Sequence, residues 1–271
     1  MTANTTDLLA LCLAFLPAAT PQNWMTQWSL APAIVIPLML MAGAYGRALR
    51  LERSPPSALA LTGFAILALA LVSPLCRLAA TLASVHMLQF ILLSIVAPAT
   101  IAATLLREVT CFERRLAAWL CRQTRALGIM TALYGGLIWF LHAPPVYAAT
   151  LTDPVIHVAA TWTLVTVALA WFLVIFSQAR SQPGKVAANV FLTMVHTGLL
   201  GVILTFAPDL LYPFQADGAT AWGLAPLADQ QLAGLIMWVV GNLAYLGIGL
   251  AILMRGLNLS DREISPTGGY R

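Results

Sequence analysis

The sequence predicts an all-α integral membrane protein, a bundle of seven transmembrane helices with its N-terminus outside and its C-terminus in the cytoplasm. Its 271 residues are 60% hydrophobic and only 9% charged, whereas a soluble domain is about 25% charged. Seven segments approach the roughly 20 apolar residues that cross a bilayer. Lys and Arg also concentrate in alternate connections between these segments. Together these observations exclude a soluble protein of similar length.

The seven expected spans follow one another with short connections. They cover approximately residues 29–46, 57–75, 79–106, 126–142, 155–177, 186–207 and 230–254. Three prolines, Pro32, Pro37 and Pro98, fall inside them and should kink a helix or lie near its end.

A shorter apolar patch, "LLALCLAFLPAA" (8–19), precedes the first span. The residues before it carry Asp7 and no Lys or Arg, unlike the basic start of a signal peptide. We therefore expect residues 1–28 to form a weak signal-like or interfacial segment. Residues 29–255 would form the membrane domain, and 256–271 a cytoplasmic tail.

The positive charge indicates orientation. Thirteen of the fourteen Lys and Arg lie in connections 47–56, 107–125 and 178–185 or after the last expected span, and only Arg77 lies on the other side. Basic connections stay in the cytoplasm. The net charge of +4 therefore reflects topology and does not indicate nucleic-acid binding.

Two connections have a character of their own. Connection 107–125 has apolar residues at helical spacing between arginines, which predicts a surface helix in the inner interface. The outer connection 208–231 is the longest, and long connections without structure are often functional. The four cysteines show neither a disulfide framework nor a zinc pattern, and we expect Cys111 and Cys121 to be free thiols.

Histidines and methionines occupy the outer half or the middle of the expected spans. The candidate copper ligands are His86, His157, His196, Met87 and Met237. Imidazole and thioether ligands together suit Cu(I). A neutral histidine can instead form hydrogen bonds between helices, and methionines commonly fill space in apolar cores.

Enzyme motifs are absent from the sequence. It has no P-loop, dinucleotide fingerprint, HExxH motif or Ser–His–Asp pattern. No acidic residue lies deep within an expected span. The sequence therefore predicts a protein that is not an enzyme.

Five motifs in order resemble a known family. They are "HMLQF" (86–90), "WFLHAPPVY" (139–147), "TDPVIHVAAT" (152–161), "GVILTFAPDLLYP" (201–213) and "WGLAPLADQQLAGLIMWV" (222–239). In this combination the chain resembles the membrane-embedded CtaG proteins, the assembly factors of caa(3)-type cytochrome c oxidase. The resemblance covers residues 29–255, and its last motif is the most specific.

The resemblance implies a multi-pass protein of the bacterial plasma (inner) membrane that helps to mature the oxidase, with copper handled on the extracytoplasmic side. Its partners would be cytochrome c oxidase subunits, a periplasmic copper chaperone and the lipid bilayer, and no nucleic acid. Within the shared motifs, Asp229, Gln230, Gln231 and His142 are the residues expected at the partner-binding or loop region.

Two positions depart from the family pattern. Phe90 stands where the pattern H-M-x-Q-H has its second histidine. Ala160 and Thr161 replace the acid and second histidine of H-x-x-E-H. The chain could therefore bind copper with fewer, softer ligands, or act as a metal-free scaffold for oxidase assembly. A metal transporter and a b-type cytochrome are less favoured alternatives.

Overall fold

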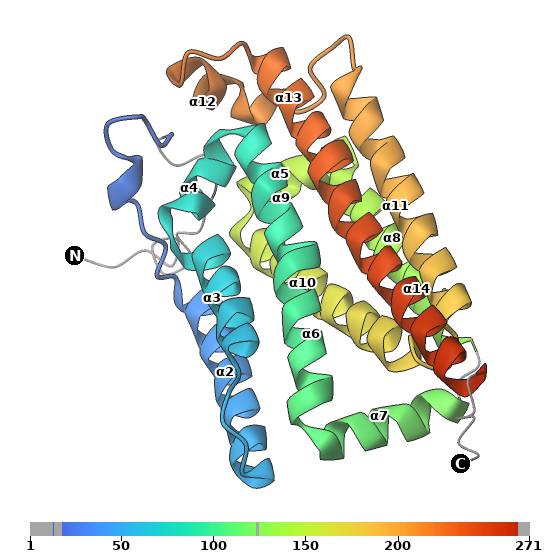
Figure 1. Ribbon diagram of the computed structural model, residues 1–271. Helices are drawn as coiled ribbons and strands as arrows, with labels where there is room; N and C mark the ends of the chain where they lie inside the picture. Colours follow the sequence, from blue (N-terminus) through green and yellow to red (C-terminus); the bar gives the residue numbers. More distant parts are fainter. Residues whose placement is uncertain (1–12, 14–17, 123–124, 265–271) are drawn as a thin grey trace, which may run out of the picture.

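The computed structural model is a bundle of helices (Figure 1). It describes residues 13, 18–122 and 125–264, and every regular element in this part is helical. Among the described residues, five helices are long and apolar enough to cross a membrane, or seven when each of two bent pairs counts as one span. These five are α2 (Pro32–Glu52), Ala83–Glu108, α10 (Pro154–Gln178), α11 (Pro183–Thr205) and Pro226–Leu257.

Two of these spans contain a π-helical turn. The first joins α5 (Ala83–Ile91) and α6 (Ala97–Glu108) through Leu92–Val96. The second joins α13 (Pro226–Leu235) and α14 (Asn242–Ile264) through Ile236–Gly241. Such turns are frequent near functional sites. Because α14 continues to Ile264, the helix extends beyond the expected boundary at residue 255.

The bent pairs turn at prolines. Helices α3 (Ala58–Val72) and α4 (Pro74–Thr81) meet at 52°, and α8 (Ala126–His142) and α9 (Pro144–Thr152) meet at 75°. Ser73 and Ala143 are extended because a residue before proline avoids the helical region. The third expected span was wrong at its start: Leu82 is also extended, so residues 79–81 belong to α4.

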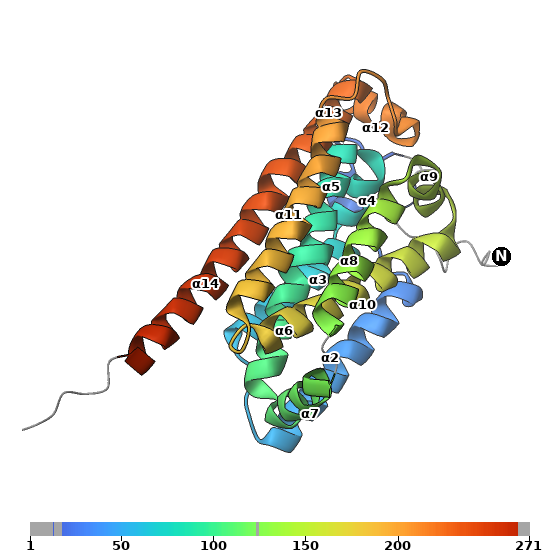
Figure 2. The same ribbon diagram turned by 90° about the vertical axis from the view of Figure 1, so that its right-hand side faces the viewer.

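The connection expected to lack structure is instead folded. It contains a 3₁₀ turn (Pro213–Gln215) and α12 (Ala216–Ala221), and α13 begins already at Pro226. Gly218 packs so closely on α4 that an added Cβ would lie 2.1 Å from the Thr81 carbonyl oxygen. Helices α4, α9 and α12 therefore gather at one end of the bundle (Figure 2).

The N-terminal segment also reaches this end. Trp222 donates through Nε1 to the Ala19 carbonyl oxygen at 2.6 Å, and Ala19 N donates to Thr81 Oγ1 at 3.0 Å. The buried Arg77 donates to the Leu13 carbonyl oxygen at 3.1 Å. The rest of the expected signal-like segment, residues 1–12 and 14–17, and residues 265–271 of the expected tail lie outside the described residues.

Helix α7 (Thr110–Arg122) runs across the opposite end of the bundle (Figures 1 and 2). Its Phe112 packs against a small cluster made of Tyr45, Leu49, Ala60 and Val109, and Leu116 packs against the main core. These two residues of the apolar face therefore contact protein, and the expected position of the helix in the membrane interface stays a prediction. We call this end the basic end, after its exposed cations, which are Arg47, Arg50, Arg53, Arg107, Arg114, Arg115, Arg125, Arg180, Lys185 and Arg255.

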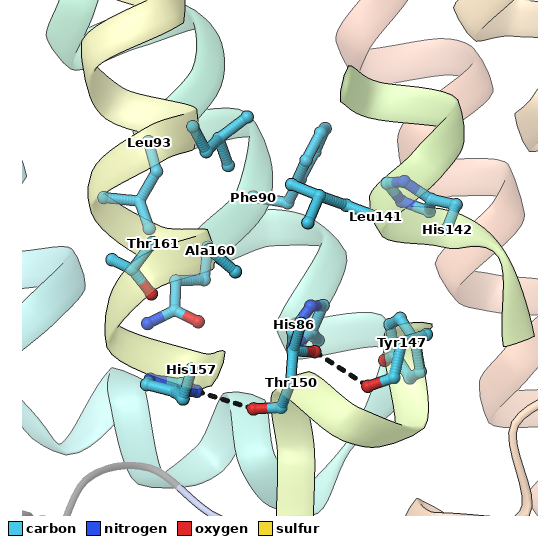
Figure 3. Close-up of a pocket in the computed structure, with 12 residues that line it drawn as sticks. His86, Phe90, Leu93, Leu141, His142, Tyr147, Thr150, His157, Ala160 and Thr161 are labelled. Carbon is cyan, nitrogen blue, oxygen red and sulfur yellow. Dashed lines mark hydrogen bonds between the residues drawn. The ribbon is translucent and has the colours of Figure 1, made fainter. Parts of the chain in front are cut away.

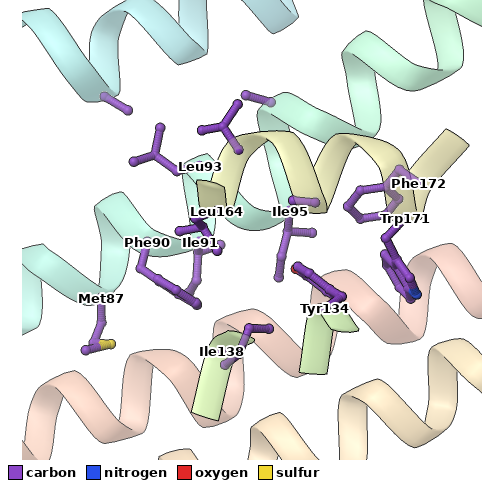
Figure 4. Close-up of a cluster of buried hydrophobic side chains, with 14 of the residues drawn as sticks. Met87, Phe90, Ile91, Leu93, Ile95, Tyr134, Ile138, Leu164, Trp171 and Phe172 are labelled. Carbon is purple, nitrogen blue, oxygen red and sulfur yellow. The ribbon is translucent and has the colours of Figure 1, made fainter. Parts of the chain in front are cut away.

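Large aromatic side chains fill the core (Figure 4). The hydroxyl of Tyr134 donates to the Ser94 carbonyl oxygen at 2.7 Å and lies 2.8 Å from that of Tyr245. Trp171 donates through Nε1 to Thr131 Oγ1 at 3.1 Å. The polar atoms of these three rings thus have partners, as is usual for buried Tyr and Trp.

The cysteines differ in part from expectation. Cys111 is a free, exposed thiol, which the sequence predicted. Cys76, however, is disulfide-bonded, although the spacing of the cysteines indicated no disulfide. A disulfide joins residues that are close in space, and sequence spacing does not reveal that proximity.

Candidate functional site

One cavity lies between α5, the α8–α9 corner and α10 (Figure 3). Its volume is about 60 Å³, enough for an ion or a few small atoms. Three of the four histidines line it, and apolar residues form much of the remaining wall. The lining residues are His86, Gln89, Phe90, Leu93, Leu141, His142, Tyr147, Thr150, His157, Ala160, Thr161 and Leu164.

His142 has one bonded and one unbonded ring nitrogen. Its Nδ1 lies 2.8 Å from the Ile138 carbonyl oxygen, and a carbonyl can only accept, so Nδ1 carries the proton. Its Nε2 is buried and has no hydrogen-bond partner. A buried polar atom without a partner is costly, so this nitrogen is a candidate ligand for a metal ion.

His157 lies on the other side of the cavity, and its Nδ1 is also bonded to a backbone carbonyl. Its Nδ1 donates to the Thr150 carbonyl oxygen at 2.9 Å (Figure 3). Asp153 caps the first turn of α10 by accepting hydrogen bonds from the backbone of Val155 and Ile156, which fixes the helix around His157. Histidines that bind metals usually donate their second ring nitrogen to a carbonyl in this way.

His86 lies in the first turn of α5, whose start is fixed by Asp229. The buried carboxylate of Asp229 accepts hydrogen bonds from Ala83 N at 2.6 Å, from Ser84 N at 3.2 Å and from the Ser84 hydroxyl. This cap satisfies backbone N–H groups that a helix start leaves without partners. Asp229 and Ala83 are 146 positions apart in the chain. Their contact fixes the start of α5 and therefore the position of His86 in the cavity.

Tyr147 connects His86 to the connection between α11 and α13. Its ring lies edge-on to His86 at 5.0 Å and stacks on Tyr212 at 4.0 Å. Tyr147 donates its hydroxyl to Gln215 Oε1 at 2.7 Å, and Tyr212 donates to the His142 carbonyl oxygen at 2.7 Å. Burial raises the pKa of the Tyr212 phenol, so it remains a donor at neutral pH.

The residues expected in the partner-binding region form internal contacts. Gln230 accepts hydrogen bonds from the backbone of Leu211 and Tyr212 at 2.6 and 3.0 Å. Gln231 donates to the Ala207 carbonyl oxygen at 3.3 Å. Together with Asp229, these side chains attach the connection before α13 to the bundle.

The structure divides the expected metal ligands into separate groups. His86 and His157 line the same cavity. Met87 and Met237 are buried in the core and are not among its lining residues. His196 lines a different groove between α8 and α11. His142 lines the same cavity as His86 and His157. In the sequence, the proline that follows His142 and bends the chain marked this as an unusual position.

The ligand set is small. Within residues 13, 18–122 and 125–264, no three His, Cys, Asp or Glu side chains are placed to hold one ion together. Copper in this cavity would therefore have few protein ligands. Imidazoles with unbonded Nε2 atoms suit such a site because neutral imidazole binds copper.

Comparison with known proteins identifies the family. Searches of curated proteins and of solved structures found no match. Residues 43–258 match the family model described as cytochrome c oxidase caa3 assembly factor (Caa3_CtaG). This match includes all three histidines of the cavity and the Asp229–Gln231 segment. The chain therefore belongs to the CtaG family of caa3-type cytochrome c oxidase assembly factors.

Proposed function

We propose that this protein holds copper(I) as a cargo during oxidase assembly and delivers it on the extracytoplasmic side of the bacterial plasma membrane. It acts without catalysing a reaction, together with oxidase subunits and a periplasmic copper chaperone. One observation carries the proposal: His142 and His157 line one cavity, and each has its Nδ1 bonded to a backbone carbonyl.

The chemistry of the cavity suits a cargo rather than a permanent cofactor. The bonded Nδ1 atoms leave Nε2 of both imidazoles free to bind a soft ion. His86 also lines the cavity and could replace one of them as a ligand. A site with few ligands binds copper more weakly, which allows its release to an oxidase site with more ligands.

Two features support the orientation. The basic end, which carries α7, should face the cytoplasm, so the cavity near α9 lies toward the outer side. The second feature is the disulfide bond of Cys76, because disulfides persist in the periplasm and are rare in the cytosol.

Metal analysis tests the proposal. The purified protein would be loaded with Cu(I) under anaerobic conditions and exposed to increasing concentrations of a chelator. We expect the His86→Ala plus His157→Ala variant, and the His142→Ala variant, to lose copper at lower chelator concentrations than the unmodified protein. His196→Ala is the matched control, since His196 lies outside the cavity, and it should retain copper.

An assay in cells separates this function from a metal-free scaffold. Oxidase copper content should fall in cells that carry the double variant and stay normal with His196→Ala. If the double variant supports full copper loading, the cavity histidines are structural and the scaffold alternative holds. A Soret band in the purified protein would instead support a b-type cytochrome.

A further inference from the structure

Six arginines of the basic end gather where three helix ends meet. Helices α2 and α6 end at this corner of the bundle and α7 begins there, at the bottom of the view in Figure 1. All six side chains are exposed. We call this set the arginine corner, and its members are Arg47, Arg50, Arg53, Arg107, Arg114 and Arg115.

Hydrogen bonds between glutamates and neighbouring helices hold the corner together. Glu52, the last residue of α2, accepts from Cys111 N at 2.8 Å and from the Thr110 hydroxyl at 2.9 Å, so it caps the start of α7. Glu108, the last residue of α6, accepts from the hydroxyl of Tyr45 on α2. Arginines from separate parts of the sequence therefore share one surface.

The positive charge of the corner is not balanced within it. Three glutamates, Glu52, Glu108 and Glu113, stand beside the six arginines, which leaves a surplus of three positive charges. Two of these carboxylates already accept hydrogen bonds from the fold. Each guanidinium presents five N–H donors in a fork that fits a phosphate. The corner thus has more donors than acceptors, and an external anion would supply the missing acceptors.

The backbone of Arg53 indicates a use for its side chain. Arg53 ends α2 in the left-handed region, with φ 55° and ψ 34°, and among the described residues no other non-glycine residue has a positive φ. Glycine usually occupies such a helix end because a Cβ is unfavourable there. A cation at a helix end is favourable, but Arg50 already lies in the last turn. An arginine retained at a strained position points to a role for the guanidinium.

Exposed apolar side chains lie next to these cations. Leu51 is 78% exposed and lies one helical turn from Arg47, and Trp119 is 53% exposed and lies one turn from Arg115. Charged and apolar groups meet in this way at a membrane interface, where tryptophan is enriched. The combination therefore fits a lipid, which carries an anionic headgroup and apolar chains, better than a soluble anion.

We propose that the arginine corner binds the headgroup of an anionic phospholipid. The guanidinium groups donate to the phosphate oxygens, and Leu51 and Trp119 lie beside the acyl chains. A zwitterionic phospholipid also has a phosphate, but its ammonium group opposes the positive surface, so the corner selects lipids with net negative charge. This site lies at the basic end, away from the histidine cavity, and the proposal does not depend on copper binding.

Native mass spectrometry tests the proposal. The full-length protein in detergent would be mixed with equal amounts of phosphatidylglycerol and phosphatidylcholine, and the retained lipids counted. We expect phosphatidylglycerol to be retained at least about tenfold more often. The variant Arg47→Gln plus Arg50→Gln plus Arg53→Gln should lose this preference. Its matched control carries Arg180→Gln, Lys185→Gln and Arg255→Gln, which removes the same charge from exposed positions outside the corner, and should keep the preference.

The single change Arg53→Gly separates lipid binding from backbone structure. Glycine adopts the left-handed conformation without strain, so the Tm should stay the same or rise. The Kd for phosphatidylglycerol, from spectra recorded at increasing lipid concentrations, should rise about fivefold because one cation is lost. This variant gives a clear answer even if the triple variant folds poorly.

Four outcomes would overturn the proposal. The first is equal retention of the two lipids by the unmodified protein. The second is an equal loss of preference in both triple variants, which would show an effect of net charge alone. The third is an unchanged Kd in Arg53→Gly. The fourth is displacement of the lipid by a soluble anion: inorganic phosphate would indicate a site for free phosphate, and polyglutamate a docking site for an acidic protein segment.

Discussion

The phenyl ring of Phe90 stands edge-on to the imidazole of His142, with ring centroids 4.8 Å apart and planes at 88°. Phe90 follows His86 by four residues, so both lie on the same face of α5 and both line the cavity. The H-M-x-Q-H pattern that the resemblance implied would place an imidazole at the position of Phe90. In this chain an apolar ring takes its place and lies against one of the remaining histidines.

Phe90→His should strengthen copper binding. The new imidazole would lie one turn from His86 and beside His142, so the cavity would gain a ligand where it has few. We expect the variant to retain Cu(I) at roughly tenfold higher chelator concentration, equivalent to about 1.4 kcal/mol. Phe90→Leu is the control and should not gain affinity. Equal copper retention in Phe90→His and Phe90→Leu would argue against a metal site in this cavity.

The sequence predicted the helical membrane architecture because long apolar runs and alternating charge are strong local signals. It could not predict the 52° and 75° bends or the short helix in connection 208–231, because these depend on contacts with distant residues. Gly218 illustrates this: its close contact with Thr81 joins segments that are more than 130 positions apart.

The site was predicted only in part, for a similar reason. His86 and His157 were identified from motifs, and the structure places both at one cavity. His142 also lines this cavity, and His196 lines a different groove. Depth along a span can be read from the sequence, but the direction around the helix axis cannot. His142 lines the cavity at the end of α8, while His196 lies against Gly135 and Trp139 of α8.

Asp229→Asn should destabilise the protein. The carboxylate accepts hydrogen bonds from Ala83 and Ser84. The NH₂ group of an asparagine would face at least one of these N–H or O–H groups and could not accept its hydrogen bond. A buried group left without a partner costs about 1–3 kcal/mol. We expect a lower Tm in detergent, whereas Asp209→Asn, at an exposed side chain, should leave the Tm unchanged. An unchanged Tm for Asp229→Asn would show that the cap contributes little.

Gly234→Ala should disturb the packing of α13 on α11. An added Cβ would lie 2.5 Å from Thr205 N and 2.7 Å from the Gly201 carbonyl oxygen, and backbone atoms cannot rotate away. Such overpacking typically costs 1–3 kcal/mol. The thermal unfolding temperature should therefore fall. Gly247→Ala, with no atom within 4 Å of its added Cβ, is the matched control, and an equal effect of the two changes would contradict this account.

The accessibility of Cys111 should report the orientation of the bundle. This free thiol is exposed at the basic end, which we infer to face the cytoplasm. In intact cells of a Cys121→Ser strain, Cys111 should react with a membrane-permeant maleimide and resist an impermeant one until the cells are broken.

A reporter fused after Arg255 provides an independent measurement at the same end. It should give a cytoplasmic signal, because the basic residues of α7 and α14 then remain on the side where positive charge is retained. If the impermeant reagent labelled Cys111 in intact cells, the basic end would face the outside and the inferred orientation would be wrong. The histidine cavity would then lie toward the cytoplasm, and delivery of copper to an outer oxidase site would require a different route.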